Sequence, residues 1–130
     1  MKNKFIRLSK GYQDDAGVDI TVNKKVIFKS HEMTVVDLGI GITPRKNEMV
    51  VIAPRSSYAA KGLIICNCPI DPYYTGYIHG VVYNGSNDDV ICDEGQAFCQ
   101  AIIIKIRTIR NVKIKKKGKR GDHSFGSTNE

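Results

Sequence analysis

Near its centre the chain reads Pro69-Ile70-Asp71-Pro72-Tyr73-Tyr74-Thr75-Gly76. One carboxylate, Asp71, stands three residues before an aromatic ring, Tyr74, and proline and glycine bracket both. Asp-Pro pairs commonly open turns. A turn stiffened in this way presents its side chains from a rigid edge, as a small-ligand site requires. An ordinary hairpin with a solvated Asp and a half-buried Tyr would show the same pattern, so the stretch alone leaves both interpretations open.

On both sides of this stretch, short runs of β-branched and apolar residues alternate with turn residues. The runs cover residues 4–8, 18–22, 26–28, 33–42, 48–53, 63–66, 77–83, 90–92 and 98–106. Turns are expected at 23–24 and 84–87, and one short helical turn within 54–62. No segment sustains an apolar period of about 3.6 residues. About ten strands at this spacing predict an all-β fold, either a sandwich or a jelly roll.

Length and composition indicate one soluble domain. The chain has 130 residues, of which 42% are hydrophobic and 25% charged, which is ordinary for a domain that buries a core without disulfides. No apolar run approaches the roughly 20 residues that span a bilayer, and the basic N-terminus lacks the apolar stretch of a signal peptide. We therefore expect a cytoplasmic protein with no membrane partner.

The cysteines do not show the spacing of a metal site. Cys66 and Cys68 are one residue apart, and Cys92 and Cys99 are also unlike a zinc pair. In a reducing compartment all four are expected to be free thiols, and mostly buried.

Positive charge gathers near the C-terminus. The net charge is +7, and Lys113, Lys115, Lys116, Lys117, Lys119 and Arg120 stand close together. Such a run is either a solvated, self-repelling linker or an attractor of phosphate, in a nucleotide or in a polymer. Beyond residue 114 the composition cannot build a core, so this tail is expected to be mobile unless something binds it.

Five segments stand in one order along residues 15–128. They are Asp15-Ala16-Gly17-Val18-Asp19-Ile20; Pro54-Arg55-Ser56-Ser57 with Ala59, Lys61 and Gly62; Ile70-Asp71-Pro72-Tyr73-Tyr74-Thr75-Gly76; Gly95 with Gln100; and Arg120-Gly121-Asp122-His123-Ser124-Phe125-Gly126-Ser127-Thr128. Each is weak alone. Together, at compatible spacing, they resemble the five motifs of the trimeric dUTP diphosphatase (dUTPase) family, and the compact size would suit a phage or viral member.

The resemblance implies an activity and an assembly. It implies hydrolysis of dUTP to dUMP and pyrophosphate with Mg²⁺, which limits uracil incorporation into DNA and supplies dUMP for dTMP synthesis. It also implies a distorted jelly-roll core over residues 1–112. A basic linker and glycine-rich arm over 113–130 would close an active site shared within a homotrimer, in the host-cell cytoplasm if the protein is viral.

The resemblance also assigns roles in the third motif. Asp71 matches the catalytic Asp, which orients or deprotonates the attacking water and hydrogen-bonds the sugar 3′-hydroxyl. Tyr74 matches the aromatic ring beneath the deoxyribose, where it excludes a 2′-hydroxyl. Ile70 lies beside them in the substrate site, and Asn67 is the candidate for a base-proximal Asn.

The phosphate side of the site draws on the other motifs. Ser56 and the amides around Ser57 would line the phosphates, and Arg55 would either touch phosphate or, as we prefer, brace the site through a carboxylate. Gln100, a polar residue in an apolar run, must find partners, and the family's matching Gln reaches the phosphate region. Asp19 would contact Mg²⁺ through water.

From the arm, the resemblance assigns phosphate contacts to Arg120 and stacking on the uracil to Phe125. Gly126 would let the backbone approach the nucleotide, and Ser127 and Thr128 would hydrogen-bond the γ-phosphate.

Two departures bear on specificity. The segment 62–71 is shorter than in the family pattern, and it belongs to the hairpin that reads the uracil edge. His123 and Ser124 stand where the family usually has two glycines, and His123 would either contact a phosphate or, as we prefer, face solvent. His79 stands where a variable pocket residue would lie and has no assigned role. A dCTP deaminase would need a Glu in the strand 77–83, which has no acid. A regulatory or binding module with altered nucleotide preference, or one with a protein or nucleic-acid partner, stays open as an alternative.

Overall fold

The computed structural model describes residues 15–107 and 109. Its strands are β1 (Val18–Thr21), β2 (Val26–Phe28), β3 (Met33–Gly41), β4 (Glu48–Pro54), β5 (Leu63–Ile65), β6 (Tyr77–Asn84), β7 (Val90–Cys92) and β8 (Ala97–Lys105), and its helix is α1 (Ser56–Ala59). Every run predicted within this part of the chain is a strand, and each end lies within one residue of the expected one. The strand predicted at 4–8 lies outside the described residues.

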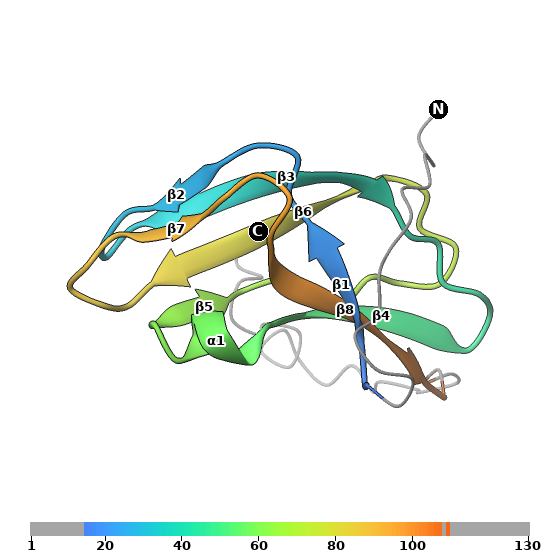
Figure 1. The fold of residues 1–130 in the computed structure, drawn as a ribbon. Coiled ribbons are helices and arrows are strands. Elements are labelled where there is room, and N and C mark those ends of the chain that lie inside the picture. Colours follow the sequence, from blue (N-terminus) through green and yellow to red (C-terminus); the bar gives the residue numbers. More distant parts are fainter. Residues whose placement is uncertain (1–14, 108, 110–130) are drawn as a thin grey trace, which may run out of the picture.

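The strands pair into antiparallel sheets, which confirms the all-β expectation. The strand orders are β1-β8-β4, β2-β7 and β3-β6-β5. Figure 1 shows β3 and β6 running across one layer, with β2 and β7 beside them, while β8 and β4 cross the other layer. The turn expected at 23–24 closes no hairpin, because β1 pairs with β8 and β2 with β7. It carries the chain from one sheet to another, as jelly rolls require.

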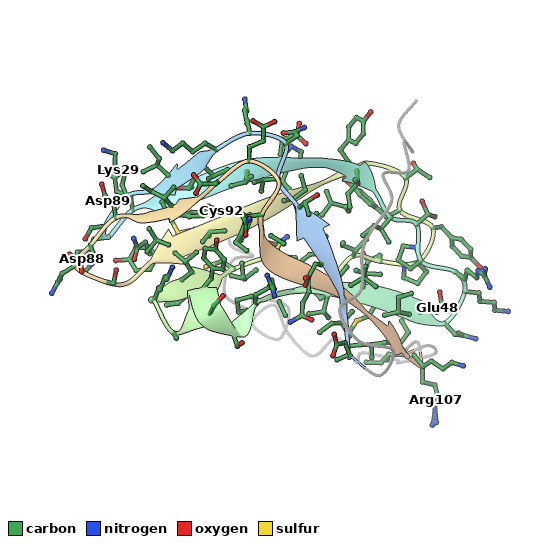
Figure 2. All side chains as sticks on the ribbon, in the orientation of Figure 1. Lys29, Glu48, Asp88, Asp89, Cys92 and Arg107 are labelled. Carbon is green, nitrogen blue, oxygen red and sulfur yellow. The ribbon has the colours of Figure 1, made fainter. Side chains whose placement is uncertain are left out.

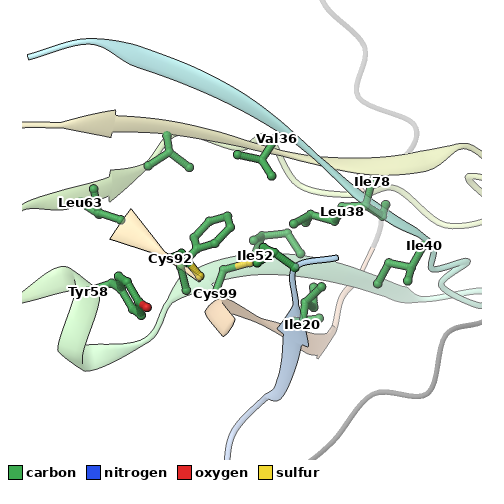
Figure 3. Close-up of a cluster of buried hydrophobic side chains, with 14 of the residues drawn as sticks. Ile20, Val36, Leu38, Ile40, Ile52, Tyr58, Leu63, Ile78, Cys92 and Cys99 are labelled. Carbon is green, nitrogen blue, oxygen red and sulfur yellow. The ribbon is translucent and has the colours of Figure 1, made fainter. Parts of the chain in front are cut away.

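The core lies between these layers. Phe28 and Phe98 are fully buried and meet edge to face, with ring centroids 5.0 Å apart. Cys92 and Cys99 lie in the same cluster (Figure 3). Burial raises the pKa of the Cys99 thiol to about 12 and also raises the pKa of Cys92. Both therefore stay protonated at neutral pH and pack as small apolar side chains.

The four cysteines are free thiols, as expected, but the expectation that most of them are buried is wrong for two. Cys66 and Cys68 are exposed. They follow β5, which is an edge strand of its sheet, and a segment leaving a sheet edge has no second layer to cover it.

Asn84 is the buried polar side chain of the described residues, and it joins β6 to β2 and to the β6–β7 turn. Its Nδ2 donates to the carbonyls of Phe28 (2.8 Å) and Asp88 (2.9 Å). Its Oδ1 accepts from the N–H (2.9 Å) and the hydroxyl (2.8 Å) of Ser86. One amide therefore satisfies β2 and the β6–β7 turn together, which is why its burial is tolerated. Figure 2 shows Lys29, Asp88 and Asp89 at this end of the molecule.

Replacing Asn84 with Ala should lower the free energy of unfolding by about 2–3 kcal/mol, because one buried carbonyl and two part-buried groups, a carbonyl and an N–H, lose their partners. Urea unfolding at constant protein concentration measures the change. Asn87→Ala, an exposed change in the same turn, should cost less than about 0.5 kcal/mol. Equal effects of the two substitutions would contradict a structural role for the Asn84 amide.

Candidate active site

Asp71, Pro72, Tyr73 and Tyr74 form one tight turn, as the sequence predicts. The Tyr74 N–H donates to the Asp71 carbonyl over 3.2 Å, and Tyr73, the third residue, has a φ of 68°. Proline second and a positive φ third match a type II turn. Such a turn brings its end residues within about 7 Å, measured between Cα atoms. The exposed side chains of Asp71 and Tyr74 therefore stand at its two ends.

Backbone contacts fasten this turn to the sheet framework. Ile70 exchanges two hydrogen bonds with Val50 of β4, at 2.9 and 3.1 Å, and its side chain is buried. On the other side, the Tyr73 N–H donates to the carbonyl of Pro44 over 2.9 Å. The turn is thus held at both ends by residues that are distant in sequence.

The Tyr74 ring is placed by its own hydroxyl and by the glycine that follows. The hydroxyl donates to the carbonyl of Tyr77 over 3.2 Å. A Cβ at Gly76 would overlap that hydroxyl, so the ring can fold back only because residue 76 has no side chain. The glycine of the third motif is therefore explained by the position of the ring.

The turn forms part of the wall of a pocket with a volume of about 270 Å³. The pocket is lined by Asn67, Pro69, Ile70, Asp71, Tyr74, Tyr77, Ile78 and His79. The structure therefore brings together the site residues predicted from the third motif and Asn67. Its volume is slightly below the range of about 300–1,000 Å³ that small-ligand sites have, and polar groups stand among apolar ones as such sites require.

The side-chain amide of Asn67 is already engaged. Its Nδ2 donates to the carbonyl of His79, and its Oδ1 accepts from the N–H of Val81, each over 2.7 Å. Just before it, the Cys66 N–H donates to the Val81 carbonyl, also over 2.7 Å. The amide therefore continues the β5–β6 ladder as a peptide group would, in the segment where the chain has fewer residues than the family pattern.

A second group of predicted residues lies where β1, β8 and β4 meet. Arg55 Nε is 3.4 Å from Asp19 Oδ1, and Gln100 Nε2 donates to the Pro54 carbonyl over 3.2 Å. Asp19 and Gln100 are also register partners across β1 and β8. The preferred interpretation of Arg55, bracing through a carboxylate, is thereby supported. The part-buried Gln100 finds a partner, as a polar residue in an apolar run requires.

Gly17 makes this close packing possible. A Cβ on residue 17 would come within 2.6 Å of Gln100 Oε1 and 2.9 Å of the Ala101 carbonyl oxygen. The adjacent serines, Ser56 and Ser57, open α1 with exposed side chains. Their hydroxyls and backbone N–H groups are thus available to an anion that approaches beside Arg55.

The two groups stand at different positions along β4. Ile70 pairs with Val50, whereas Pro54 pairs with Cys99 next to Gln100. Four strand residues span about 13 Å. Because the Val50–Ile70 pairing is antiparallel, Asp71 lies beyond Ile70 in the direction away from Pro54. A single chain therefore does not bring Asp71 and Arg55 together.

The donors present suit Mg²⁺ only in an indirect role. Within residues 15–107 and 109, no group of three or more His, Cys, Asp or Glu side chains could hold a metal ion. Asp19 offers one carboxylate, and Arg55 stands beside it. Mg²⁺ commonly keeps several waters and binds through one or two carboxylates and substrate phosphates. Asp19 therefore fits a Mg²⁺ ion that is bound mainly by substrate phosphates and keeps its own waters.

Some predictions fall outside the described residues. These are the boundary between the core and the arm at residue 112, and Arg120, Phe125, Gly126, Ser127 and Thr128 of the arm. Within the part of the chain that the structure describes, no helix has the length and apolar character needed to cross a membrane.

Tyr77, Ile78 and His79 line the pocket but were not predicted as site residues. A signal was present, because alternation along a strand puts residues 77 and 79 on one face. The missing information was which face borders the turn, and that depends on how β6 pairs with the segment around Asn67.

The comparisons with known proteins converge on one family. A family model described as dUTPase matches residues 3–129. A deoxyuridine 5'-triphosphate nucleotidohydrolase of Hydrogenobaculum sp. (strain Y04AAS1) is 32% identical over 119 residues, which are 87% of this chain and 83% of that protein. A Pol polyprotein of Ovine maedi visna related virus (strain South Africa) is 27% identical over 88% of this chain, and the chain spans only 11% of that polyprotein.

Among solved structures, native EIAV dUTPase superposes with a TM-score of 0.75 at 24% identity, covering 85% of this chain and 92% of that one. At this identity the structural likeness shows the fold.

The strained turn supplies a test of the geometry. Tyr73 is 63% exposed, and a left-handed conformation costs a non-glycine residue about 1–2 kcal/mol. Tyr73→Gly should therefore leave the free energy of unfolding unchanged or raise it by up to about 1 kcal/mol. Tyr73→Val should lower it by about 1 kcal/mol or more, because β-branched residues avoid positive φ. Urea unfolding measures both variants. A higher free energy of unfolding for Tyr73→Val than for Tyr73→Gly would contradict the positive φ of residue 73.

Proposed function

The chain belongs to the dUTPase family, and we propose on that basis that it hydrolyses dUTP to dUMP and pyrophosphate. The observation that carries the proposal is the pocket that gathers Asp71, Tyr74 and Ile70 on one braced turn. These are the family's substrate-site positions, and in this chain they border one pocket. The product dUMP would serve dTMP synthesis, and removal of dUTP would limit uracil incorporation into DNA.

Asp71 acts on the attacking water. Its side chain is exposed in the pocket and accepts no hydrogen bond within residues 15–107 and 109, so both oxygens are available to water and to the sugar 3′-hydroxyl. Water attacks the α-phosphorus, the bond from that phosphorus to the bridging oxygen of the β-phosphate breaks, and pyrophosphate leaves. The carboxylate orients the water and takes its proton.

Tyr74 selects the sugar. Its ring is fixed by the hydroxyl contact to Tyr77 and by the close approach to Gly76. A ring held in this way beneath a deoxyribose cannot yield space to a 2′-hydroxyl, so ribonucleotides are excluded by overlap. The sugar preference therefore depends on the rigidity of the turn as well as on the identity of the side chain.

The distance between the two groups along β4 favours a site shared between protomers. Asp71 comes from one protomer, and the phosphate-facing residues around Arg55, Ser56 and Gln100 come from its neighbour, in a homotrimer. Aliphatic side chains that are more than half exposed would supply surface to such an assembly. They are Met33, Val35, Ile64, Ile103 and Ile109.

The remaining parts of the proposal lie on the phosphates and the arm. Mg²⁺ bound to the triphosphate would neutralise charge on the phosphate oxygens, and Asp19 would meet its water shell. In the proposed division, residues 1–112 form the core and 113–130 the linker and arm. Arg120, Phe125, Gly126, Ser127 and Thr128 close over the nucleotide, with Phe125 stacked on the uracil.

The direct test is pyrophosphate release from dUTP, dCTP, dTTP and UTP. We expect turnover of dUTP at least about a hundredfold above the others, and Asp71→Asn should lower kcat for dUTP about 10²–10⁴-fold because the general base is lost. Asp88→Asn, an exposed acid outside the pocket, is the matched control and should be fully active. Comparable turnover of dCTP or UTP would overturn the assigned selectivity.

Mixed assemblies test whether the site is shared. Asp71→Asn and Arg55→Gln should each lower activity at least about a hundredfold. Trimers refolded from an equal mixture of the two variants should recover about a quarter of wild-type activity, because some interfaces pair two intact halves. Mass spectrometry of the intact assemblies verifies that mixed trimers form. If mixed trimers form and no activity returns, both groups act within one protomer.

A further inference from the structure

We propose that Cys66 and Cys68 form a two-thiolate binding site for a soft monovalent metal ion, of which Cu⁺ is the representative. The site lies outside the pocket, so the inference goes beyond the proposed function and does not depend on it. Three observations carry it. Both thiols are exposed, they stand at alternate positions of the chain, and hydrogen bonds on both sides of them fix the backbone.

The backbone around the two cysteines is held at three points. The Cys66 N–H donates to the Val81 carbonyl over 2.7 Å, and the side-chain amide of Asn67 bonds to β6 at both ends. Beyond Cys68, Ile70 exchanges two hydrogen bonds with β4. Cys68 also precedes a proline, which favours an extended conformation. The two cysteine side chains therefore leave an extended segment from fixed positions.

The thiols stand on the side of this segment that faces away from the pocket. Asn67 and Pro69 line the pocket, whereas Cys66 and Cys68 are exposed and do not line it. Alternate residues of an extended segment point to the same side. The two sulfur atoms therefore share one solvent-facing side of the pocket wall, and an ion reaches both without entering the pocket.

The spacing of the two residues suits a bridging ion better than a disulfide. Alternate residues of an extended segment are about 6.6 Å apart, whereas a disulfide needs Cβ atoms about 3.5–4.5 Å apart. Metal–thiolate bonds are about 2.3 Å long, so an ion in line between two sulfur atoms holds them about 4.6 Å apart. Thiols that lean toward each other along the segment reach that separation. The Cys66 thiol gives up only a weak contact with the Ile64 carbonyl, at 3.9 Å.

The number of ligands selects the ion. Within residues 15–107 and 109, no group of three or more His, Cys, Asp or Glu side chains could hold a metal ion. Zn²⁺ takes four ligands in structural sites, so two thiolates serve it poorly. Soft thiolate ligands select Cu⁺, which is stable between two sulfur atoms in a line. Each thiol releases its proton as Cu⁺ binds, and the two thiolates with one Cu⁺ carry a net charge of about −1.

The test is titration of the full chain, without oxygen, with Cu⁺ supplied as its bicinchoninate complex. We expect each chain to withdraw one Cu⁺. Cys66→Ser and Cys68→Ser should each lower the affinity at least about a hundredfold, because the second bond of a chelate forms at a high effective concentration that a single thiolate lacks. A thiol-specific aromatic disulfide reagent should modify both exposed thiols of the folded wild-type chain before Cu⁺ is added and neither of them afterwards.

A matched control keeps the number of exposed thiols and changes their spacing. The double variant Cys68→Ser with Asp88→Cys has one exposed thiol after β5 and another in the β6–β7 turn. It should bind Cu⁺ no more tightly than Cys68→Ser alone. Zn²⁺ should bind the wild-type chain at least about a hundredfold more weakly than Cu⁺, because two of its four ligands are missing. Urea unfolding of each variant verifies that the fold is retained.

Three results would overturn the site: wild-type protein that withdraws no Cu⁺, either serine variant with the full affinity, or a spacing control that binds as tightly as wild type. Equal affinities of the wild-type chain for Zn²⁺ and Cu⁺ would overturn the two-ligand geometry. None of these measurements uses dUTP. Failure of the proposed function would therefore leave this inference in place, and failure of the Cu⁺ titration would leave the proposed function in place.

Discussion

The pair of hydrogen bonds between Ile70 and Val50 is the constraint on which the site depends. It joins the loop before β6 to the middle of β4 and buries the Ile70 side chain. Adjacent residues in extended backbone point to opposite sides, so burying Ile70 turns Asp71 outward. The type II turn then carries the chain from Asp71 to Tyr74 in the fewest residues possible, and the Tyr73–Pro44 contact secures its far side. The positive φ of Tyr73 strains the backbone. Such strain is common at functional sites, where the surrounding structure holds the residue in place.

β4 also separates the site into halves. At its middle it holds the Asp71 turn, and beyond its end it leads into Arg55, which meets Asp19. The Asp19–Arg55 pair is partly exposed, and pairs of that kind add at most about 1 kcal/mol to stability. The pair matters because it holds the Arg55 guanidinium beside the exposed side chains of Ser56 and Ser57. In the function we propose, this separation along β4 is the reason that a neighbouring protomer would complete the site.

The shortened segment before Asp71 shows how a fold can compensate for missing residues. Where a strand would continue, Asn67 offers its side-chain amide to β6 in place of a peptide group. The pocket wall survives, but the amide that was predicted to stand near the base has both ends occupied. The polar side chains of β6 that line the pocket and make no hydrogen bond within the described residues are those of Tyr77 and His79.

From the sequence alone, the strands could be placed to within a residue, because β-branched runs and turn residues are local signals. The Asp71–Tyr74 turn could also be predicted, because Pro72 and the spacing of the residues around it are typical of such a turn. The family could be predicted because its five motifs occur in order. The sequence could not assign Cys66 and Cys68 to the surface or Asn67 to the ladder, because each depends on which strands become neighbours. Only the tertiary structure decided these, along with the distance between Asp71 and Arg55. Strand pairing joins residues far apart in the chain, and no local pattern records the register in which they meet.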